Sequence, residues 1–162
     1  MSMTGKAALI TGGGTGVGRA VALKLAERGV NVAVNYSRSA IEAAATVSEI
    51  EALGVDGVAI QADVASEAAV KAMVEQTVAV FGRLDVVVNS SGTTAFVPHG
   101  DLDAMHETAW DRIQAVNLKV PFFVGRAAAP HLRASGDGAI VDVSSLAGVT
   151  GSGSSIAYVA SK

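Results

Sequence analysis

Residues 11–18 read Thr11-Gly12-Gly13-Gly14-Thr15-Gly16-Val17-Gly18, and this stretch lies between an apolar run and a segment with helical periodicity. The apolar run, Ala7 to Ile10, has the length and composition of a strand that is buried on both faces. From Val17 to Arg28 apolar residues recur at helical spacing, and Gly29 stands where a glycine often ends a helix. Because glycines let the backbone turn sharply and approach an anion at a helix N-terminus, the stretch predicts a strand–turn–helix unit with an anion site.

The rest of the chain continues this alternation of strands and helices. We predict four further strands: Asn31 to Asn35, Val58 to Ala62, Leu84 to Asn89 and Ala139 to Val143. We predict helices at about Ala40 to Leu53, from the cap Ser66 to Phe81, and over Glu107 to Arg133, with Pro121 and Pro130 as kinks or boundaries. Apolar strands separated by amphipathic helices indicate a parallel sheet that is covered on both faces. The predicted fold class is α/β: a Rossmann-type, doubly wound parallel sheet in order 3-2-1-4-5, with three α/β/α layers, in one domain over residues 1–162.

The composition excludes several classes of function. The 162 residues include no cysteine, which excludes thiol chemistry and disulfides and favours a reducing, cytoplasmic location. Charged residues make up 17% of the chain and the net charge is −3, unlike the basic surface of a nucleic-acid-binding protein. No uncharged apolar run approaches the roughly 20 residues that cross a membrane, and the first residues lack a secretory signal pattern. His99, His106 and His131 have no ligand-like spacing. We therefore expect a soluble protein without a nucleic-acid partner, a membrane partner or a metal.

The glycine-rich stretch can be compared with known phosphate-binding loops by its spacing. The P-loop pattern nearly fits from Gly13 to Gly18, but Arg19 and Ala20 follow where a lysine and a hydroxyl residue are required. The G-x-G-x-x-G pattern fails because Val17 or Arg19 takes the place of its third glycine. What fits is T-G-x-x-x-G-x-G. A plain tight turn would explain the glycines alone, but their place between a strand and a helix favours nucleotide binding.

Further motifs occur in a fixed order along the chain. They are Asp63-Val64, Asn89-Ser90-Ser91-Gly92, Asn117, Ser144-Ser145 and Tyr158-Val159-Ala160-Ser161-Lys162. With the glycine-rich stretch, these motifs resemble the short-chain dehydrogenase/reductase family over the whole range from Lys6 to Lys162. One difference is Ser90-Ser91, where the family commonly has Asn-Ala.

The resemblance implies a nicotinamide cofactor site. Asp63 and Val64 would lie beside the adenine, and Asn89 and Gly92 would line the cofactor. Together with the loop, the end of the second strand and the catalytic pair, the expected cofactor-binding residues are Thr11, Gly12, Gly14, Thr15, Gly16, Val17, Gly18, Asn35, Tyr36, Ser37, Arg38, Asp63, Val64, Asn89, Ser91, Gly92, Tyr158 and Lys162.

The end of the second strand predicts which cofactor is preferred. Asn35, Tyr36, Ser37 and Arg38 include no carboxylate that could hold the ribose hydroxyls of NAD(H), whereas Arg38 can pair with a 2′-phosphate. We therefore predict NADP(H) in preference to NAD(H). The alternative is a merely solvated Arg38, since Thr15 occupies a position where NADP-dependent relatives often carry a second basic residue.

The resemblance also implies a catalytic set of Asn117, Ser145, Tyr158 and Lys162. Tyr158 and Lys162 are four residues apart, so a helix would place both on one face, where the ammonium stabilises the phenolate. Tyrosine and lysine at this spacing usually only decorate a surface, but a serine at the end of an upstream strand favours catalysis. Ser145 is preferred to Ser144 because the family usually places its serine 13 residues before the tyrosine.

The long predicted helix holds two of the family's motif positions. By its position Asn117 could cap or kink the helix ahead of Pro121. The resemblance implies that it orders a water behind Lys162 for proton relay, and both roles are compatible. Trp110 resembles an apolar anchor of the family, and we expect it to serve packing.

The function that the resemblance implies is that of an NADP-dependent oxidoreductase acting on CH-OH groups or carbonyls, similar to the 3-oxoacyl-carrier-protein reductases. The alternatives are a sugar or polyol dehydrogenase of the same family and a catalytically silent dinucleotide-binding module; an ATP-binding protein is disfavoured by Arg19-Ala20. The presence of Ser145, Tyr158 and Lys162 together favours an enzyme. The identity of the carbonyl or alcohol substrate does not follow from the motifs.

The last predicted strand leads to an expectation about the size of the whole protein. Ala139 to Val143 is apolar on both faces, so it would leave a hydrophobic sheet edge if no strand followed it. We therefore expect the given sequence to be part of a longer chain with a sixth strand. The resemblance further implies a homotetramer or homodimer.

Overall fold

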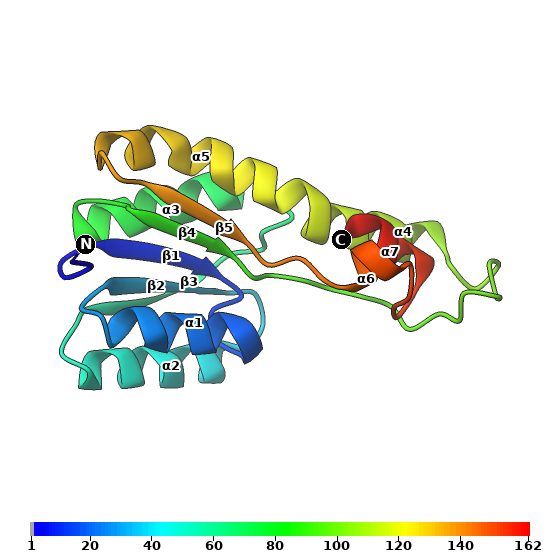
Figure 1. Ribbon diagram of the computed structural model, residues 1–162, viewed down its shortest axis with the longest axis horizontal. Helices are drawn as coiled ribbons and strands as arrows, with labels where there is room; N and C mark the ends of the chain where they lie inside the picture. The colour runs from blue at the N-terminus through cyan, green and yellow to red at the C-terminus, as the bar shows by residue number, and fades with distance from the viewer. Residues whose placement is uncertain (1) are drawn as a thin grey trace.

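The computed structural model describes residues 2–162 as five parallel strands in one sheet, in the order β3-β2-β1-β4-β5 (Figure 1). The strands are β1 (Ala7–Thr11), β2 (Asn31–Tyr36), β3 (Gly57–Gln61), β4 (Val86–Asn89) and β5 (Ala139–Asp142). Neighbouring strands are parallel throughout, so helices cross over the sheet between them. This confirms the predicted doubly wound α/β fold and its strand order.

The helices form one layer on each face of the sheet. Helices α1 (Gly16–Ala26) and α2 (Ala40–Ala52) cover one face, while α3 (Glu67–Phe81) and α5 (Val120–Ala134) cover the other (Figure 1). Alternate residues of β1 enter the two layers: Ala8 and Ile10 pack with α1 and α2, whereas Leu9 packs with α3 and α5. The strands are consequently buried from both sides.

The ends of α3 follow from its sequence. The Ser66 hydroxyl accepts a hydrogen bond from the Ala69 N–H at 3.4 Å, which satisfies one of the unpaired N–H groups of the first turn. At the other end, Gly82 adopts a left-handed φ of +74° that favours glycine, and its N–H bonds to the Val78 carbonyl. The predicted bounds of this helix are thus confirmed.

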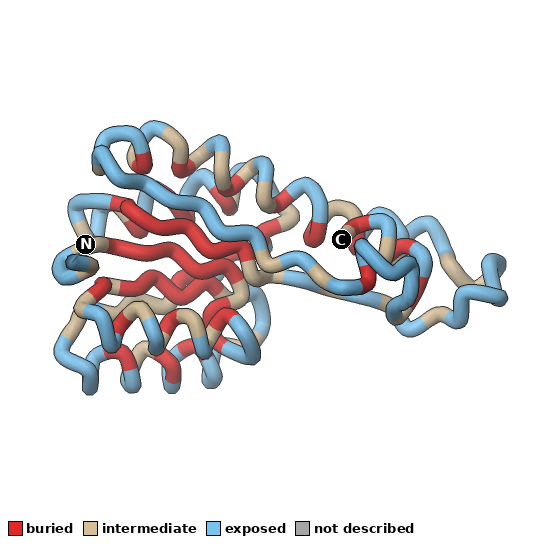
Figure 2. The backbone as a smooth tube through the Cα atoms, viewed as in Figure 1, coloured by how far each residue is buried: buried red, intermediate tan, exposed pale blue. Residues whose placement is uncertain are grey.

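Burial falls off at one edge of the sheet. Every residue of β1 and β4 is buried, whereas all four residues of β5 are exposed (Figure 2). Ile140 and Val141 are 43% and 52% exposed. The predicted last strand therefore presents an apolar edge in the described residues.

The long predicted helix is divided near Pro121, one of the two prolines at which a kink or boundary was predicted. Helix α4 (Glu107–Gln114) leads into a π-helical turn, η1 (Ala115–Lys119), and α5 begins immediately after it, with Pro121 in its first turn. Pro130 lies inside α5, which continues to Ala134, so of the two predicted alternatives, a kink or a boundary, the boundary is excluded at Pro130. Burial of the α5 stripe against the sheet keeps the helix intact there; the stripe consists of Val124, Ala128 and Leu132.

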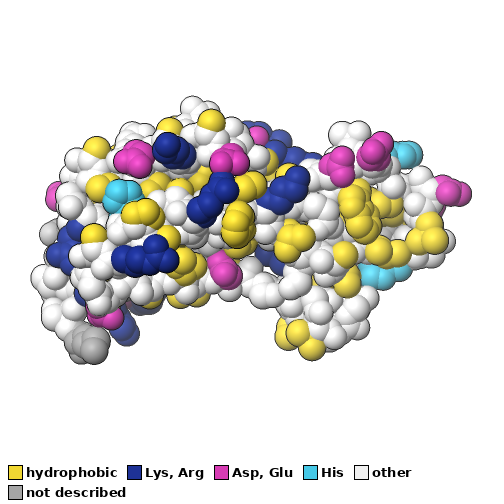
Figure 3. Space-filling model, turned by 90° about the horizontal axis from the view of Figure 1, so that it is seen from above, with side chains coloured by type: hydrophobic (Ala, Val, Ile, Leu, Met, Phe, Trp, Pro, Cys, Tyr) yellow, Lys and Arg dark blue, Asp and Glu magenta, His cyan; other side chains and the backbone are white. Residues whose placement is uncertain are grey.

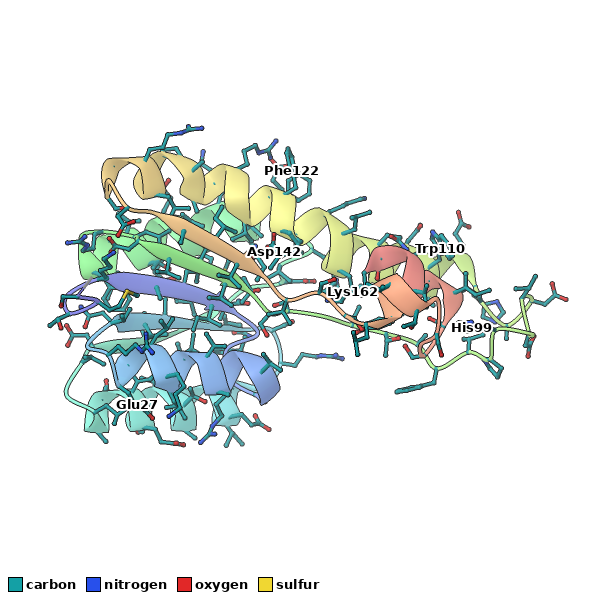
Figure 4. The ribbon with its side chains drawn as sticks, in the orientation of Figure 1. Glu27, His99, Trp110, Phe122, Asp142 and Lys162 are labelled. Carbon is teal, nitrogen blue, oxygen red and sulfur yellow. The ribbon has the colours of Figure 1, made fainter. Side chains whose placement is uncertain are left out.

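A small lobe projects beyond the carboxyl ends of the strands. It contains α4, the segment 90–106, and the short helices α6 (Ala147–Thr150) and α7 (Ile156–Ser161) (Figure 1). The Val97 N–H bonds to the Ser154 carbonyl at 2.9 Å and so ties two distant segments together. Trp110 on α4 is 37% exposed and lies on the outside of this lobe (Figure 4), so it packs less completely than predicted. Within residues 2–162, no helix combines the length and apolarity required to span a membrane.

Candidate active site

A cleft of about 1300 Å³ opens at the carboxyl ends of the strands, between the sheet and the lobe. This is where doubly wound sheets bind ligands, because loops from both halves of the fold converge there. The predicted site residues that line the cleft are Gly12, Thr15, Gly16, Val17, Asn35, Tyr36, Ser37, Arg38, Asp63, Val64, Ser91, Gly92, Tyr158 and Lys162. The predicted residues outside its lining are Thr11, Gly14, Gly18, Asn89, Asn117 and Ser145.

The glycine loop leaves no room for side chains at its turn. A Cβ on Gly18 would lie 2.4 Å from the Gly12 carbonyl oxygen, and one on Gly12 would lie 3.1 Å from the Ser91 Cα. Gly14 instead packs its backbone against Ala43 of α2. The loop thus brings the N-terminus of α1, with its unpaired N–H groups and positive dipole end, to the floor of the cleft.

Two predicted residues hold the loop in place. The Thr11 hydroxyl accepts hydrogen bonds from the N–H groups of Ser90 and Ser91, both at 3.1 Å. The buried Asn35 accepts from the Gly12 N–H at 3.3 Å and donates to the Ala62 carbonyl at 3.1 Å. Thr11 and Asn35 therefore connect the loop to the ends of the neighbouring strands.

A pair of opposite charges crosses the cleft beyond β3. Arg112 of α4 directs its guanidinium to Asp63, with N–O distances of 3.1 and 3.2 Å to the two carboxylate oxygens. The hydrogen bonds from Arg112, followed by one from the Ala65 N–H, hold the pKa of Asp63 below its ordinary value. Arg38, at the exposed end of β2, also stabilises the Asp63 carboxylate through its charge.

Tyr158 and Lys162 reach the cleft from α7 and its end. The Ser155 hydroxyl caps α7 by accepting from the Tyr158 N–H at 3.2 Å, which sets the direction in which the helix begins. The Lys162 ammonium donates to the Val143 carbonyl just beyond β5, at 3.0 Å. Lys162 therefore lies where the sheet meets the lobe (Figure 4).

The two serines after β5 differ in their surroundings. Ser144 lines the cleft, and its hydroxyl donates to the Lys162 carbonyl at 2.9 Å. The Ser145 hydroxyl accepts from the Ala147 N–H at 3.1 Å, at the start of α6. The structure thus places both serines beside the tyrosine-bearing lobe, with Ser144 facing the cleft.

Asn117 lies in the π-helical turn and is 6% exposed. Its amide donates to the Thr93 carbonyl and to the Ser161 hydroxyl, and its oxygen accepts from the Thr93 N–H, each at 2.9 Å. A Cβ on Gly92 would lie 3.7 Å from the Asn117 Oδ1 and 3.9 Å from the Lys162 ammonium. Asn117 therefore joins the loop after β4 to α7, close to Lys162.

Asn89 is placed below the cleft rather than in its lining. Its amide donates to Asp142 of β5 at 2.7 Å, so it connects two adjacent strand ends. Its Oδ1 is buried and has no hydrogen-bond partner among the described residues.

Some lining residues stand in stretches that the sequence had already pointed to: Ser90 and Ser144 belong to the motifs, and Thr93, Thr94 and Phe96 fall in the segment from Thr93 to Asp103 that is expected to line the pocket entrance. The lining residues that the sequence did not single out are Ser39, Ala62, Arg112, Val116, Val143 and Ser154. Thr94 and Ser154 share a hydrogen bond between their hydroxyls although 60 residues separate them. Such contacts depend on how α4 and the segment 90–106 fold over the sheet, which local patterns do not encode. Within residues 2–162, no three histidine, aspartate or glutamate side chains gather as a metal site would require.

The chain is similar to known proteins both in sequence and in fold. Over its 162 residues the chain is 46% identical to the 3-oxoacyl-[acyl-carrier-protein] reductase FabG of Staphylococcus aureus, and it spans 64% of that relative's length. A dehydrogenase/reductase structure from Sinorhizobium meliloti superposes with a TM-score of 0.90 at 38% identity, covering 99% of this chain and 63% of that one. An NAD⁺-bound xylitol dehydrogenase superposes with a TM-score of 0.91 at 31% identity, covering 100% and 61%.

The family match extends over nearly the whole chain. Residues 6–162 match the short chain dehydrogenase family, and they include the glycine loop, Asn117, both serines, Tyr158 and Lys162. The chain therefore belongs to the short-chain dehydrogenase family.

Proposed function

We propose that the protein is an NADP(H)-preferring oxidoreductase that moves a hydride between a nicotinamide cofactor and a carbonyl or secondary alcohol, most like a 3-oxoacyl-carrier-protein reductase. The observation that carries this proposal is that one cleft holds Tyr158, Lys162 and the glycine loop. The 46% identity to a relative described as a 3-oxoacyl-[acyl-carrier-protein] reductase supports the substrate class.

The cleft offers a dinucleotide a volume of about 1300 Å³ and backbone N–H groups that can bind its phosphates. The side-chain-free turn formed by Gly12 and Gly18 opens the N-terminus of α1 to a pyrophosphate. Val64, just beyond β3, offers an apolar contact to an adenine, and Arg38 offers a positive charge to a phosphate on its ribose. When bound, a nicotinamide cofactor would supply or accept the hydride.

The remaining residues have roles in handling the substrate oxygen and its proton. Tyr158 donates a proton from its hydroxyl during reduction and accepts one during oxidation. Ser145 donates a hydrogen bond to the substrate oxygen and so stabilises the alkoxide that develops there. Lys162 holds the cofactor ribose, while Asn117 positions Thr93 and α7 beside it.

The preference for NADP(H) rests on charge at the end of β2. Residues 35–38 contain an arginine and no carboxylate, so a 2′-phosphate would meet attraction rather than repulsion. The experiment is to titrate the purified protein with NADPH and NADH and to follow the cofactor fluorescence. Tighter binding of NADPH supports the preference, and equal affinity for both cofactors contradicts it.

A second candidate function is that of a polyol dehydrogenase using NAD⁺. It is favoured by the TM-score of 0.91 to an NAD⁺-bound xylitol dehydrogenase. The two functions are distinguished by assaying a 3-oxoacyl thioester with NADPH against xylitol and related polyols with NAD⁺. Turnover of the thioester supports the first function. Turnover of polyols alone supports the second, and binding of cofactor without turnover of either class supports a silent module.

We propose that the protein forms a homo-oligomer, because apolar side chains are exposed on the outer surface of η1 and α5. Figure 3 looks onto this face, where hydrophobic side chains lie among lysines and arginines. Leu118 is 58% and Phe122 63% exposed, and the Arg126 guanidinium lies 5.4 Å from the centre of the Phe122 ring. Exposed apolar residues grouped in this way are typical of protein interfaces. Light scattering on the purified protein would measure the number of subunits, and a monomer would contradict this part of the proposal.

A further inference from the structure

Arg112 and Asp63 meet at the cleft although they come from different layers of the fold. Arg112 belongs to α4 of the lobe, whereas Asp63 follows β3 at the carboxyl edge of the sheet. Each of two guanidinium nitrogens faces its own carboxylate oxygen, at 3.1 and 3.2 Å, which is the geometry of a two-point ion pair. Both side chains line the cleft.

The strand register brings Asp63 close to Arg38. Tyr36 of β2 pairs with Gln61 of β3, and Arg38 and Asp63 each stand two residues beyond this pair. The two residues therefore follow adjacent strands at matching positions along the chain, and the Arg38 charge stabilises the Asp63 carboxylate. No hydrogen bond or ion pair joins Arg38 to any of residues 2–162 in this structure, whereas Arg112 engages both oxygens of Asp63.

An unpaired Asp63 would act against a phosphate at Arg38 in two ways. Its carboxylate would be free to pair with Arg38, and its charge would repel the phosphate, which carries close to two negative charges at neutral pH. Arg112 removes both effects by occupying the carboxylate.

We propose that Arg112 determines the preference for a ribose 2′-phosphate without binding it, by sequestering Asp63 so that Arg38 stays available for the phosphate monoester. This inference rests on the proposed cofactor preference and assigns Arg112 as a positioning residue of that site. The pair is half exposed, with side-chain exposures of 47% and 48%, so its contribution to folding stability is small. The pair instead changes the net charge of the cleft beside a bound 2′-phosphate.

The test uses two probes that differ only by the phosphate in question: adenosine 2′,5′-bisphosphate and adenosine 5′-monophosphate. Isothermal titration calorimetry on the purified protein gives the affinity for each, and their ratio is the selectivity for the 2′-phosphate. We expect Arg112→Gln to lower this ratio by about three- to tenfold, as expected for one unit charge acting at the edge of a solvated cleft. Arg112→Lys, which keeps the charge, should retain most of the selectivity.

The double-mutant cycle with Asp63→Asn distinguishes sequestration from a simple sum of charges. Asp63→Asn alone should leave the ratio within about twofold of the wild-type value, because Asp63 is already neutralised, and it should restore the ratio lost in Arg112→Gln. If Asp63→Asn instead raises the ratio as much as Arg112→Gln lowers it, the two side chains act as independent charges and the proposal is overturned.

Control variants separate this inference from the proposed cofactor preference. Lys24→Gln removes a positive charge from an exposed ion pair outside the cleft and should leave the ratio unchanged. If Arg38→Ala abolishes the selectivity while Arg112→Gln has no effect, or weakens both probes equally, the inference fails and the cofactor preference stands. If the wild-type protein binds both probes equally, the cofactor preference fails and the inference fails with it.

Discussion

Asn117 and Thr93 exchange two hydrogen bonds: the Asn117 oxygen accepts from the Thr93 N–H, and the Asn117 amide donates to the Thr93 carbonyl, both at 2.9 Å. The same amide also donates to the Ser161 hydroxyl at 2.9 Å. One side chain of the π-helical turn therefore holds the loop after β4 and the helix that carries Tyr158. The π turn displaces this side chain from the regular helical pattern, as such turns often do at functional sites.

Replacing Asn117 by alanine should destabilise the protein and misplace α7, the helix that carries Tyr158. The change leaves both Thr93 backbone groups and the Ser161 hydroxyl without their buried partner, which typically costs about 1–3 kcal/mol. We expect a corresponding fall in the urea midpoint and a fall in kcat. Asn31→Ala is the matched control, because Asn31 makes a single exposed hydrogen bond, to the Asp56 N–H at 3.0 Å, and should change stability little. Equal effects of the two variants would contradict the role assigned to Asn117.

Tyr158→Phe should remove most of the activity while keeping the cofactor. Loss of a general acid lowers the rate by a factor of about 100 to 10,000, whereas the phenyl ring keeps its place on α7. We expect kcat to fall within this range and the affinity for NADPH to stay within about twofold. Steady-state kinetics and fluorescence titration measure the two quantities. Retention of more than about half of the wild-type kcat would show that another group transfers the proton.

The two serines after β5 can be distinguished by parallel alanine variants. If Ser145 holds the substrate oxygen, Ser145→Ala should lower kcat by about 100-fold or more, as removal of one oxyanion donor does elsewhere. Ser144→Ala should act mainly through its bond to the Lys162 carbonyl and cost much less. The comparison is informative because Ser144 lines the cleft and Ser145 does not. A larger loss in Ser144→Ala would assign the catalytic hydroxyl to Ser144.

Gly18→Ala should impair cofactor binding through the shape of the loop. The added methyl group would lie 2.4 Å from the Gly12 carbonyl oxygen, so the turn must shift away from α1. We expect the affinity for NADPH to fall by more than about tenfold, which corresponds to about 1.4 kcal/mol. Gly100→Ala is the control, since nothing lies within 4 Å of a Cβ there. Unchanged affinity in Gly18→Ala would show that the loop does not hold the cofactor.

Asp85 should make stability depend on pH below about 4. Its side chain is fully buried, and it accepts hydrogen bonds from the Ala7 N–H at 2.9 Å and from the Arg83 guanidinium at 2.7 and 2.6 Å. Burial alone raises the pKa of Asp85, but these hydrogen bonds outweigh it and the pKa lies below its ordinary value. The stabilisation is therefore present above the unfolded-state pKa of about 3.9 and is lost as the pH falls through the lower folded-state pKa.

Two variants test this linkage by urea unfolding at pH 7 and pH 3. Asp85→Asn should lose stability at pH 7 and show a smaller difference between the two pH values than the wild-type protein does. Asp137→Asn is the control, because Asp137 pairs with Lys6 at the surface, 2.8 Å away and 62% exposed, where such pairs contribute little. An unchanged pH dependence in Asp85→Asn would assign the acid sensitivity to other carboxylates.

Periodicity and turn chemistry were enough to predict the strands, their order and the loop between β1 and α1. These features depend on short stretches: an apolar run such as Ala7 to Ile10 must be buried on both faces, and a turn as tight as that at Gly18 admits no side chain. The family motifs then predicted most of the residues that line the cleft. The interruption of the long helix near Pro121 was predicted, but its π-helical form at Ala115–Lys119 was not, because that turn depends on contacts from Asn117 to distant segments.

The sequence by itself thus determined the layered fold and which residues gather at the ends of the strands, since both follow from local spacing and from the repeated strand–helix order. Only the tertiary structure decided that Ser144 faces the cleft and that Arg112 engages Asp63. It also decided that Thr11 holds the glycine loop by hydrogen bonds and does not line the cleft. The physical reason is that hydrogen bonds and ion pairs act over about 3 Å, so partners 49 residues apart, such as Arg112 and Asp63, are set only by how the lobe packs on the sheet.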